Sequence, residues 1–210
     1  MSLNLEKPAI CLITKGEATV SNFGEKRREI LDIIRVAVEE KVTLIQLREK
    51  KLTARLLFEL TVDAAAITRG TATRLLVNDR ADIALAAKAD GVHLASNSLS
   101  TDVIRRHFPE DFIIGVSTHS LEAVELAAKM RADFAVFGPV FDTPGKGQPK
   151  GIAILAEVCD ALRPFPVLGL GGLDESNVSS VLDVGAAGFA AIRSLNDAGS
   201  LRSICRKLKK

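Results

Sequence analysis

Ala89-Asp90-Gly91-Val92 joins a predicted helix to a predicted strand, and the chain contains two similar junctions. They read Ala132-Asp133-Phe134-Ala135 and Ala186-Ala187-Gly188-Phe189. By our assignment they precede the fourth, sixth and eighth strands, so the repeat recurs at every second strand. Such a repeat fits a closed (βα)8 barrel, whose interior layers are filled from alternate strands, better than an open doubly wound sheet.

Short apolar runs alternate with amphipathic stretches along the chain, which is the pattern of βα units and a parallel sheet. The predicted strands lie near 9–14, 42–48, 74–78, 91–94, 112–117, 133–138, 166–170 and 188–192. The predicted helices lie near 25–40, 53–69, 80–88, 100–107, 120–130, 151–162, 174–184 and 197–208. These eight units predict an α/β protein with a single (βα)8 TIM barrel.

A Rossmann fold is the structural alternative. It expects G-x-G-x-x-G after the first strand, where Thr14-Lys15-Gly16-Glu17 stands instead. No Pro/Ser/Gly-rich linker divides the chain, so we expect one domain over residues 1–210.

Composition narrows the class of protein. With 210 residues, 47% apolar, the chain can bury a full-sized core. A net charge of +2 and the absence of Trp and Tyr argue against nucleic-acid binding. Without a membrane-length apolar run or a signal-peptide pattern, we expect a cytoplasmic protein with no membrane partner, while homo-oligomer formation stays open. Cys11, Cys159 and Cys205 are odd in number and widely separated, which favours reduced core thiols.

The stretch Thr43-Leu44-Ile45-Gln46-Leu47-Arg48-Glu49-Lys50 predicts an anion site. Strand alternation carries the face of Leu44 and Gln46 onward into Arg48 and Lys50, at the strand end where parallel αβ proteins bind ligands. A forked guanidinium beside an ammonium suits phosphate or diphosphate. The alternative is that Glu49, Lys50 and Lys51 form an ordinary solvated charge cluster.

Asn78-Asp79 ends the third predicted strand. Asp79 has two interpretations, since Asp is a good helix N-cap and a carboxylate beside phosphate binders is also the usual protein ligand of Mg²⁺.

Gly115-Val116-Ser117-Thr118-His119-Ser120 ends the fifth predicted strand. We expect Ser120 to cap the next helix and leave Ser117 and His119 facing the mouth or the barrel wall. His93 is expected to be packed and hydrogen-bonded, and His107 to lie on the surface.

Two further strand ends carry anion-binding features. The long connection 138–151 contains Lys146 and Lys150, and is either a lid over a phosphorylated substrate or a plain surface loop. Gly171-Gly172 follows the seventh strand and Arg193 the eighth, where barrel enzymes commonly hold a phosphate.

Together these pieces resemble the thiamine phosphate synthase family and its sister group of thiazole tautomerases, from the first strand to the eighth. The matching phrases are Gln46-Leu47-Arg48-Glu49-Lys50, Asn78-Asp79-Arg80, Ala89-Asp90-Gly91-Val92-His93-Leu94, Gly115-Val116-Ser117-Thr118-His119-Ser120, Gly138-Pro139-Val140-Phe141 and Gly169-Leu170-Gly171-Gly172. Jointly they are specific, whereas each alone is weak.

The resemblance implies a transferase that joins an aminopyrimidine diphosphate to a thiazole phosphate and expels diphosphate. It implies that the pyrimidine diphosphate is held by Gln46, Arg48, Lys50, Asn78, Ser117 and Lys146. It implies that the thiazole phosphate is surrounded by Thr143, Gly172, Ile192 and Arg193. Mg²⁺ would be the cofactor and Asp79 its ligand, while Arg48, Lys50 and Lys146 would stabilise the transition state.

The chain also departs from the synthase pattern. Ser98 stands where that pattern has an Asp that is a second Mg²⁺ ligand, Gly145 where it has Thr, Arg193 where it has Ser, and Lys15 replaces an acidic residue. These changes lean towards the tautomerase group, in which His119 would be the general acid or base. Gln46, Lys50 and Asp79 favour the synthase. A third alternative is a barrel that binds thiamine intermediates without turnover.

Overall fold

The computed structural model describes residues 8–208, which form a closed barrel of eight parallel strands in the order β1 to β8. The strands are β1 (Ala9–Ile13), β2 (Leu44–Leu47), β3 (Arg74–Asn78), β4 (Gly91–Leu94), β5 (Ile113–Thr118), β6 (Phe134–Phe137), β7 (Val167–Leu170) and β8 (Gly188–Ala191). The closed order confirms the predicted (βα)8 barrel and excludes the Rossmann alternative.

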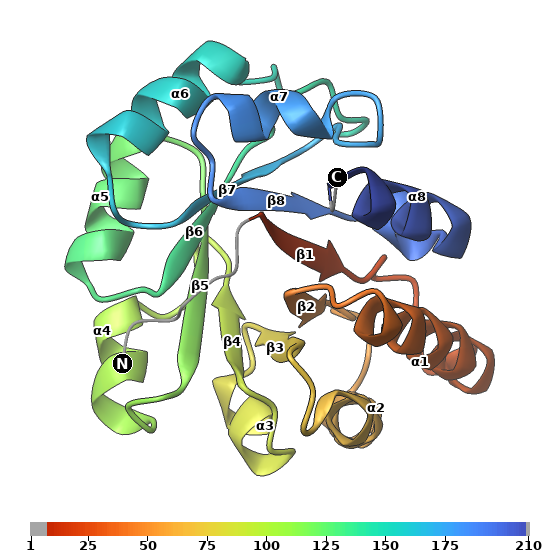
Figure 1. The fold of residues 1–210 in the computed structure, drawn as a ribbon. Coiled ribbons are helices and arrows are strands. Elements are labelled where there is room, and N and C mark those ends of the chain that lie inside the picture. The colour runs from red at the N-terminus through yellow and green to blue at the C-terminus, as the bar shows by residue number, and fades with distance from the viewer. Residues whose placement is uncertain (1–7, 209–210) are drawn as a thin grey trace.

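Each strand is followed by a helix, and Figure 1 shows the helices surrounding the ring of strands. The helices are α1 (Phe23–Glu39), α2 (Ala54–Thr68), α3 (Ala81–Ala86), α4 (Thr101–His107), α5 (Leu121–Lys129), α6 (Ile152–Ala161), α7 (Val178–Asp183) and α8 (Ala198–Leu208). Within residues 8–208, no helix combines the length and hydrophobicity that a membrane crossing requires.

The core has two layers because successive strand residues face opposite sides of the sheet. Outward strand residues such as Leu12 and Phe189 belong to one buried cluster with helix residues such as Ile34 of α1 and Leu60 of α2. Inward residues fill the barrel interior, where Phe134 is fully buried. All three cysteines are free and buried, as expected from their spacing.

The repeated junctions have a structural role at the N-terminal end of the barrel. The Asp90 carboxylate accepts a hydrogen bond from the Leu75 amide of β3 at 2.8 Å, and the Asp133 carboxylate accepts one from the Ile114 amide of β5 at 2.7 Å. In both cases an Asp just before one strand fixes the start of the preceding strand. The third junction has Ala187 in place of Asp and lacks this bond.

One predicted boundary was wrong, and one short element was not predicted. The predicted helix at 174–184 begins only at Val178, because Asp174 accepts from Ser176 and Asn177 accepts from the Asp174 amide, which closes a turn before the helix. A short 3₁₀ helix, η1 (Ser194–Asn196), also precedes α8 and was not predicted.

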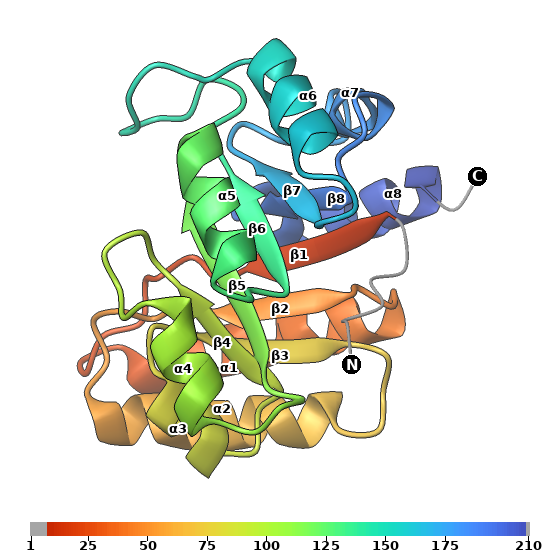
Figure 2. The ribbon, with the colours of Figure 1, turned by 90° about the vertical axis from the view of Figure 1, so that its left-hand side faces the viewer.

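The loops that follow the strands lie at one end of the barrel, which we call the mouth. Figure 2 shows the red loop after β1, the lime loop after β4 and the teal loop after β6 all leaving the left-hand side. Residues at the carboxyl ends of distant strands are therefore neighbours, and this geometry assembles the candidate site.

Candidate active site

Glu49 anchors the first loop of the mouth. It is only 2% exposed, and its carboxylate accepts from the Thr14 hydroxyl at 2.6 Å, the Gly16 amide at 3.1 Å and the Ala18 amide at 2.9 Å. The solvated-cluster interpretation is therefore wrong for Glu49, whereas Lys50 and Lys51 are exposed. Sequence reasoning missed this role because the three donors lie more than thirty residues away.

Arg48 is held at the mouth by the same anchor. Its backbone amide donates to the Thr14 hydroxyl oxygen at 2.8 Å. Its guanidinium lies against Gly16, where an added Cβ would be 3.3 Å from Nη1. The guanidinium forms no ion pair with any other residue in 8–208, so its charge is free for an anionic ligand.

A line of polar contacts joins the ends of β2 and β3. The Gln46 amide donates to Asn78 Oδ1 at 3.0 Å, and the Asn78 amide donates to Asp79 Oδ2 at 2.8 Å. Lys50 Nζ lies 3.8 Å from the same Asp79 oxygen. Gln46 and Asn78 are buried at the top of the interior, so the structure brings together three of the residues predicted for the diphosphate site and the predicted metal ligand, Asp79.

Asp79 does not cap the next helix. The N-cap of α3 is Arg80, and the Asp79 side chain turns instead towards the loop after β4, from a backbone with φ of 58°. There its Oδ1 accepts from the Ala95 amide at 2.8 Å and from the Ser98 hydroxyl. The capping alternative is therefore wrong, and Ser98 is a direct partner of the predicted metal ligand.

The surroundings of Asp79 favour the ionised form of its carboxyl group. Burial acts to raise its pKa, but the donors from Ser98 and Ala95, the Lys50 charge and the Asn78 amide outweigh burial and hold the pKa below its ordinary value. An ionised carboxylate is what a cation site requires.

The residues around Asp79 fit Mg²⁺ only in a restricted form. Within residues 8–208, no three His, Cys, Asp or Glu side chains come together as a ligand set. Oδ1 already accepts two hydrogen bonds, and Oδ2 accepts one from Asn78. A carboxylate oxygen has two lone pairs, so one acceptor position remains on Oδ2, the oxygen that lies 3.8 Å from Lys50 Nζ. The site thus suits a cation that takes most of its ligands from a phosphorylated substrate and water.

His93 lies behind this surface, inside the barrel. It is 1% exposed, its Nε2 lies 2.9 Å from Ser117 Oγ, and its Nδ1 has no hydrogen-bond partner in the described chain. Burial, with the Arg48 charge, lowers the pKa of His93 to about 4, although Asp79 acts in the opposite sense. The expectation of a packed and hydrogen-bonded His93 is confirmed for one ring nitrogen only.

His119 is exposed at the end of β5, and its Nδ1 lies 2.6 Å from the Gly138 carbonyl oxygen. A carbonyl only accepts, so Nδ1 must carry the proton, and in the neutral ring Nε2 keeps its lone pair. The ring is therefore oriented for proton transfer at Nε2. Ser120 caps α5 as predicted, accepting from the Ala123 amide, and His107 is on the surface as expected.

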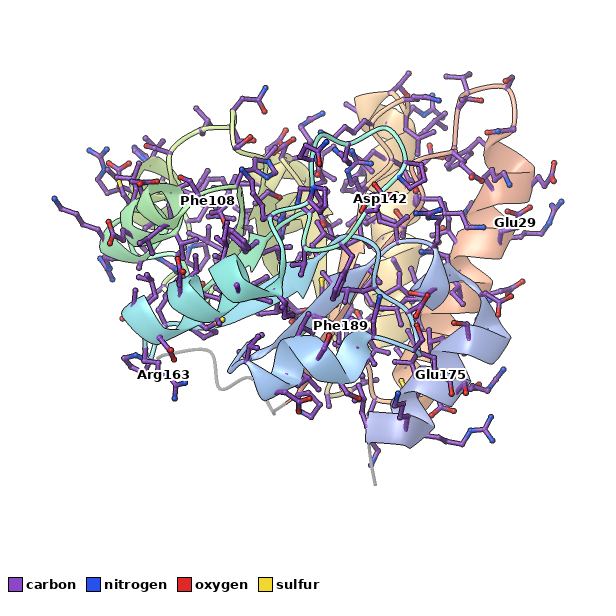
Figure 3. The ribbon with its side chains drawn as sticks, turned by 90° about the horizontal axis from the view of Figure 1, so that it is seen from above. Glu29, Phe108, Asp142, Arg163, Glu175 and Phe189 are labelled. Carbon is purple, nitrogen blue, oxygen red and sulfur yellow. The ribbon has the colours of Figure 1, made fainter. Side chains whose placement is uncertain are left out.

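The loop after β6 packs onto the glycines after β7. The Val140 and Phe141 amides donate to the carbonyls of Leu170 and Gly171 at 2.7 and 3.1 Å. Gly172 has a φ of 63°, and a Cβ there would lie 2.6 Å from the Asp142 carbonyl oxygen. Only glycine fits this close contact between the two loops. In Figure 3, Asp142 lies in the loop above the barrel, towards the opposite end from Arg163.

The remaining predicted residues lie around the mouth without joining the polar line. Thr143 donates to the Phe141 carbonyl at 3.0 Å and lies over Gly171. Lys146 and Arg193 are exposed, and neither forms an ion pair within residues 8–208. Ile192 packs against the interior cluster. The structure therefore brings cations from the loops after β2, β6 and β8 to one end of the barrel, while their individual roles stay predictions.

Comparison with known proteins agrees with this geometry. The family described as thiamine monophosphate synthase matches residues 10–195. The chain belongs to the thiamine monophosphate synthase family. A thiamine-phosphate synthase of Roseiflexus castenholzii is 36% identical over 184 residues, which cover 86% of this chain and 80% of that protein. One of Chlorobium phaeobacteroides is 34% identical over 210 residues, 97% of each.

Among solved structures, the thiamine phosphate pyrophosphorylase of Pyrococcus furiosus superposes with a TM-score of 0.80. It is 28% identical, and the match covers 97% of this chain and 98% of that one. The similarity thus extends over the whole barrel of this family member and confirms the family predicted from the sequence motifs.

Proposed function

We propose that the protein is a thiamine phosphate synthase, a transferase that joins an aminopyrimidine diphosphate to a thiazole phosphate and releases diphosphate. The observation that carries the proposal is the polar line Gln46–Asn78–Asp79, with Lys50 at its end and the unpaired Arg48 beside it. Two cations and hydrogen-bond donors at one strand edge suit a diphosphate, which spreads negative charge over many oxygens.

The proposed reaction breaks the bond between the pyrimidine methylene carbon and the diphosphate oxygen, and the electron pair leaves with diphosphate. The thiazole nitrogen then gives its lone pair to the methylene carbon and forms the new C–N bond. Negative charge builds on diphosphate as it leaves, so Arg48, Lys50 and Lys146 would act by stabilising that charge. Cations already fixed by the fold act most effectively, and the Arg48 backbone is fixed through Thr14.

Mg²⁺ is proposed as the cofactor. When bound through Asp79 Oδ2 and the substrate, it would neutralise part of the diphosphate charge. The thiazole phosphate is proposed to bind near Thr143, Gly172, Ile192 and Arg193. The proposed partners are these small phosphorylated molecules and not nucleic acid or membrane, and the proposed location is the cytoplasm.

A thiazole tautomerase is the second candidate, because His119 is held through Nδ1 by the Gly138 carbonyl, which leaves Nε2 available for proton transfer. A barrel that binds thiamine intermediates without turnover is the third. It predicts binding with no product.

The deciding experiment gives the purified protein aminopyrimidine diphosphate, thiazole phosphate and MgCl₂, and measures thiamine phosphate. We expect product from the wild type, near-complete loss in Asp79→Asn, and most activity retained in His119→Asn. A tautomerase should instead lose about 10²–10⁴-fold in isomerisation rate in His119→Asn and survive Asp79→Asn. Isomerisation with that pattern, and no thiamine phosphate from the wild type, would defeat the synthase proposal.

A further inference from the structure

A buried histidine on β4, His93, contacts a serine at the end of β5, Ser117. His93 Nε2 lies 2.9 Å from Ser117 Oγ, and no other hydrogen bond of the Ser117 hydroxyl occurs within residues 8–208. Ser117 is partly exposed at the mouth, whereas His93 is buried behind it. The imidazole therefore supports the serine from inside the barrel.

The other ring nitrogen, Nδ1, is buried and has no hydrogen-bond partner among residues 8–208. A Cβ added to Gly115 would lie 2.8 Å from His93 Nδ1 and 2.4 Å from Phe134 Cζ, so even a methyl group does not fit there. The Phe134 ring packs beside the imidazole, with centroids 5.8 Å apart. Glycine at position 115 thus makes room for the two rings.

This packing selects one tautomer of the imidazole. A buried N–H without an acceptor is rarer in proteins than an acceptor with an unused lone pair. With the proton on Nδ1, the N–H would be buried without an acceptor among residues 8–208. With the proton on Nε2, the N–H donates to Ser117 Oγ, and only a lone pair on Nδ1 is left without a partner.

We propose that His93 is a positioning residue that donates from Nε2 to Ser117 and so directs the single hydroxyl proton of Ser117 towards an anion at the mouth. A hydroxyl has one proton and two lone pairs, so an oxygen that accepts from His93 keeps its proton for another acceptor. That acceptor would be an oxygen of the diphosphate. The ligand part of the inference rests on the proposed function, whereas the tautomer does not.

The first test measures the tautomer in the free protein. Nitrogen-15 NMR of the labelled histidine ring should show Nε2 protonated and Nδ1 unprotonated at neutral pH. A ring with its proton on Nδ1 would overturn the proposal, whatever the enzyme does. Because this measurement uses the wild type alone, it also decides the matter if a variant fails to fold.

The second test uses the shape difference between two amides. The amide nitrogen of Gln reaches the place of histidine Nε2, whereas that of Asn reaches only the place of Nδ1. Binding of inorganic diphosphate, followed by calorimetry, should stay close to wild type in His93→Gln and weaken on the order of tenfold in His93→Asn. Equal weakening in the two variants would mean that His93 only fills space and would overturn the proposal.

A double-variant cycle with Ser117→Ala completes the test. If His93 acts through Ser117, then His93→Asn should cost little further affinity once the hydroxyl is absent. A full tenfold loss in the Ser117→Ala background would overturn the proposal. Because the ligand is inorganic diphosphate and no turnover is required, a wild type that makes no thiamine phosphate would refute the proposed function and leave these results to judge His93.

Discussion

Glu49→Gln should destabilise the protein by about 2–4 kcal/mol, although the substitution preserves the size of the side chain. The carboxylate accepts three hydrogen bonds, from the Thr14 hydroxyl, the Gly16 amide and the Ala18 amide. In the best orientation, Gln keeps its oxygen at Oε1 and retains the first two. Its NH₂ group then faces the Ala18 N–H, so that two donors meet where a donor and an acceptor met before.

The magnitude follows from that one lost contact. A hydrogen bond to a charged group contributes about 1.5–3 kcal/mol, and a buried donor left without a partner costs about 1–3 kcal/mol. The two estimates overlap, because the Ala18 N–H is the donor in both. The expected loss of about 2–4 kcal/mol is therefore smaller than their sum. Ala18 is 0% exposed, so water cannot replace the acceptor.

The free energy of unfolding from urea denaturation measures the effect, and Lys51→Gln is the matched control. Lys51 belongs to the same charged run but is exposed, so its substitution should change stability by less than about 0.5 kcal/mol. If Glu49→Gln is as mild as the control, with an unchanged urea dependence, then the anchoring role assigned to Glu49 is wrong.

Three further predictions concern the site and the core. Arg48→Ala should leave the free energy of unfolding nearly unchanged but lower kcat/KM, with a loss of about 2–4 kcal/mol in transition-state stabilisation. Unchanged turnover would remove Arg48 from the site. Calorimetry with MgCl₂ should show little Mg²⁺ binding to the free wild type, because Asp79 has one free acceptor position. The Ser98→Asp variant should bind Mg²⁺ at least about tenfold more tightly than the wild type. Tight Mg²⁺ binding by the wild type would mean that a further ligand has been missed. Burial raises the pKa of Cys11 from 9.0 to about 12, so between these values the unfolded thiol loses a proton that the folded thiol keeps, and stability falls as pH rises. Cys11→Ala should be about 1 kcal/mol less stable than wild type at pH 7. By about pH 11 the wild type should have lost about 3 kcal/mol of stability through deprotonation of the unfolded thiol, so the variant should then be the more stable protein. A stability difference that does not change with pH would contradict this.

The sequence alone determined the barrel and which of the predicted site residues lie at its mouth. Apolar periodicity is a local property, and in a closed parallel barrel every strand end meets at one mouth, so Gln46, Arg48 and Asn78 could be grouped without coordinates. Family motifs then indicated the chemistry. The residues at the mouth were predictable because their positions depend only on strand assignment.

Only the tertiary structure decided which of these side chains touch. Glu49 resembles a surface charge until its partners from the loop after β1 are known, and they lie 31 to 35 residues away. The Ser98 hydroxyl reaches Asp79 across 19 residues, and His93 reaches Ser117 across 24. Hydrogen bonds act over about 3 Å, so small displacements of the loops decide whether they form. No pattern of residue types along the chain specifies such displacements, because they result from the packing of the whole barrel.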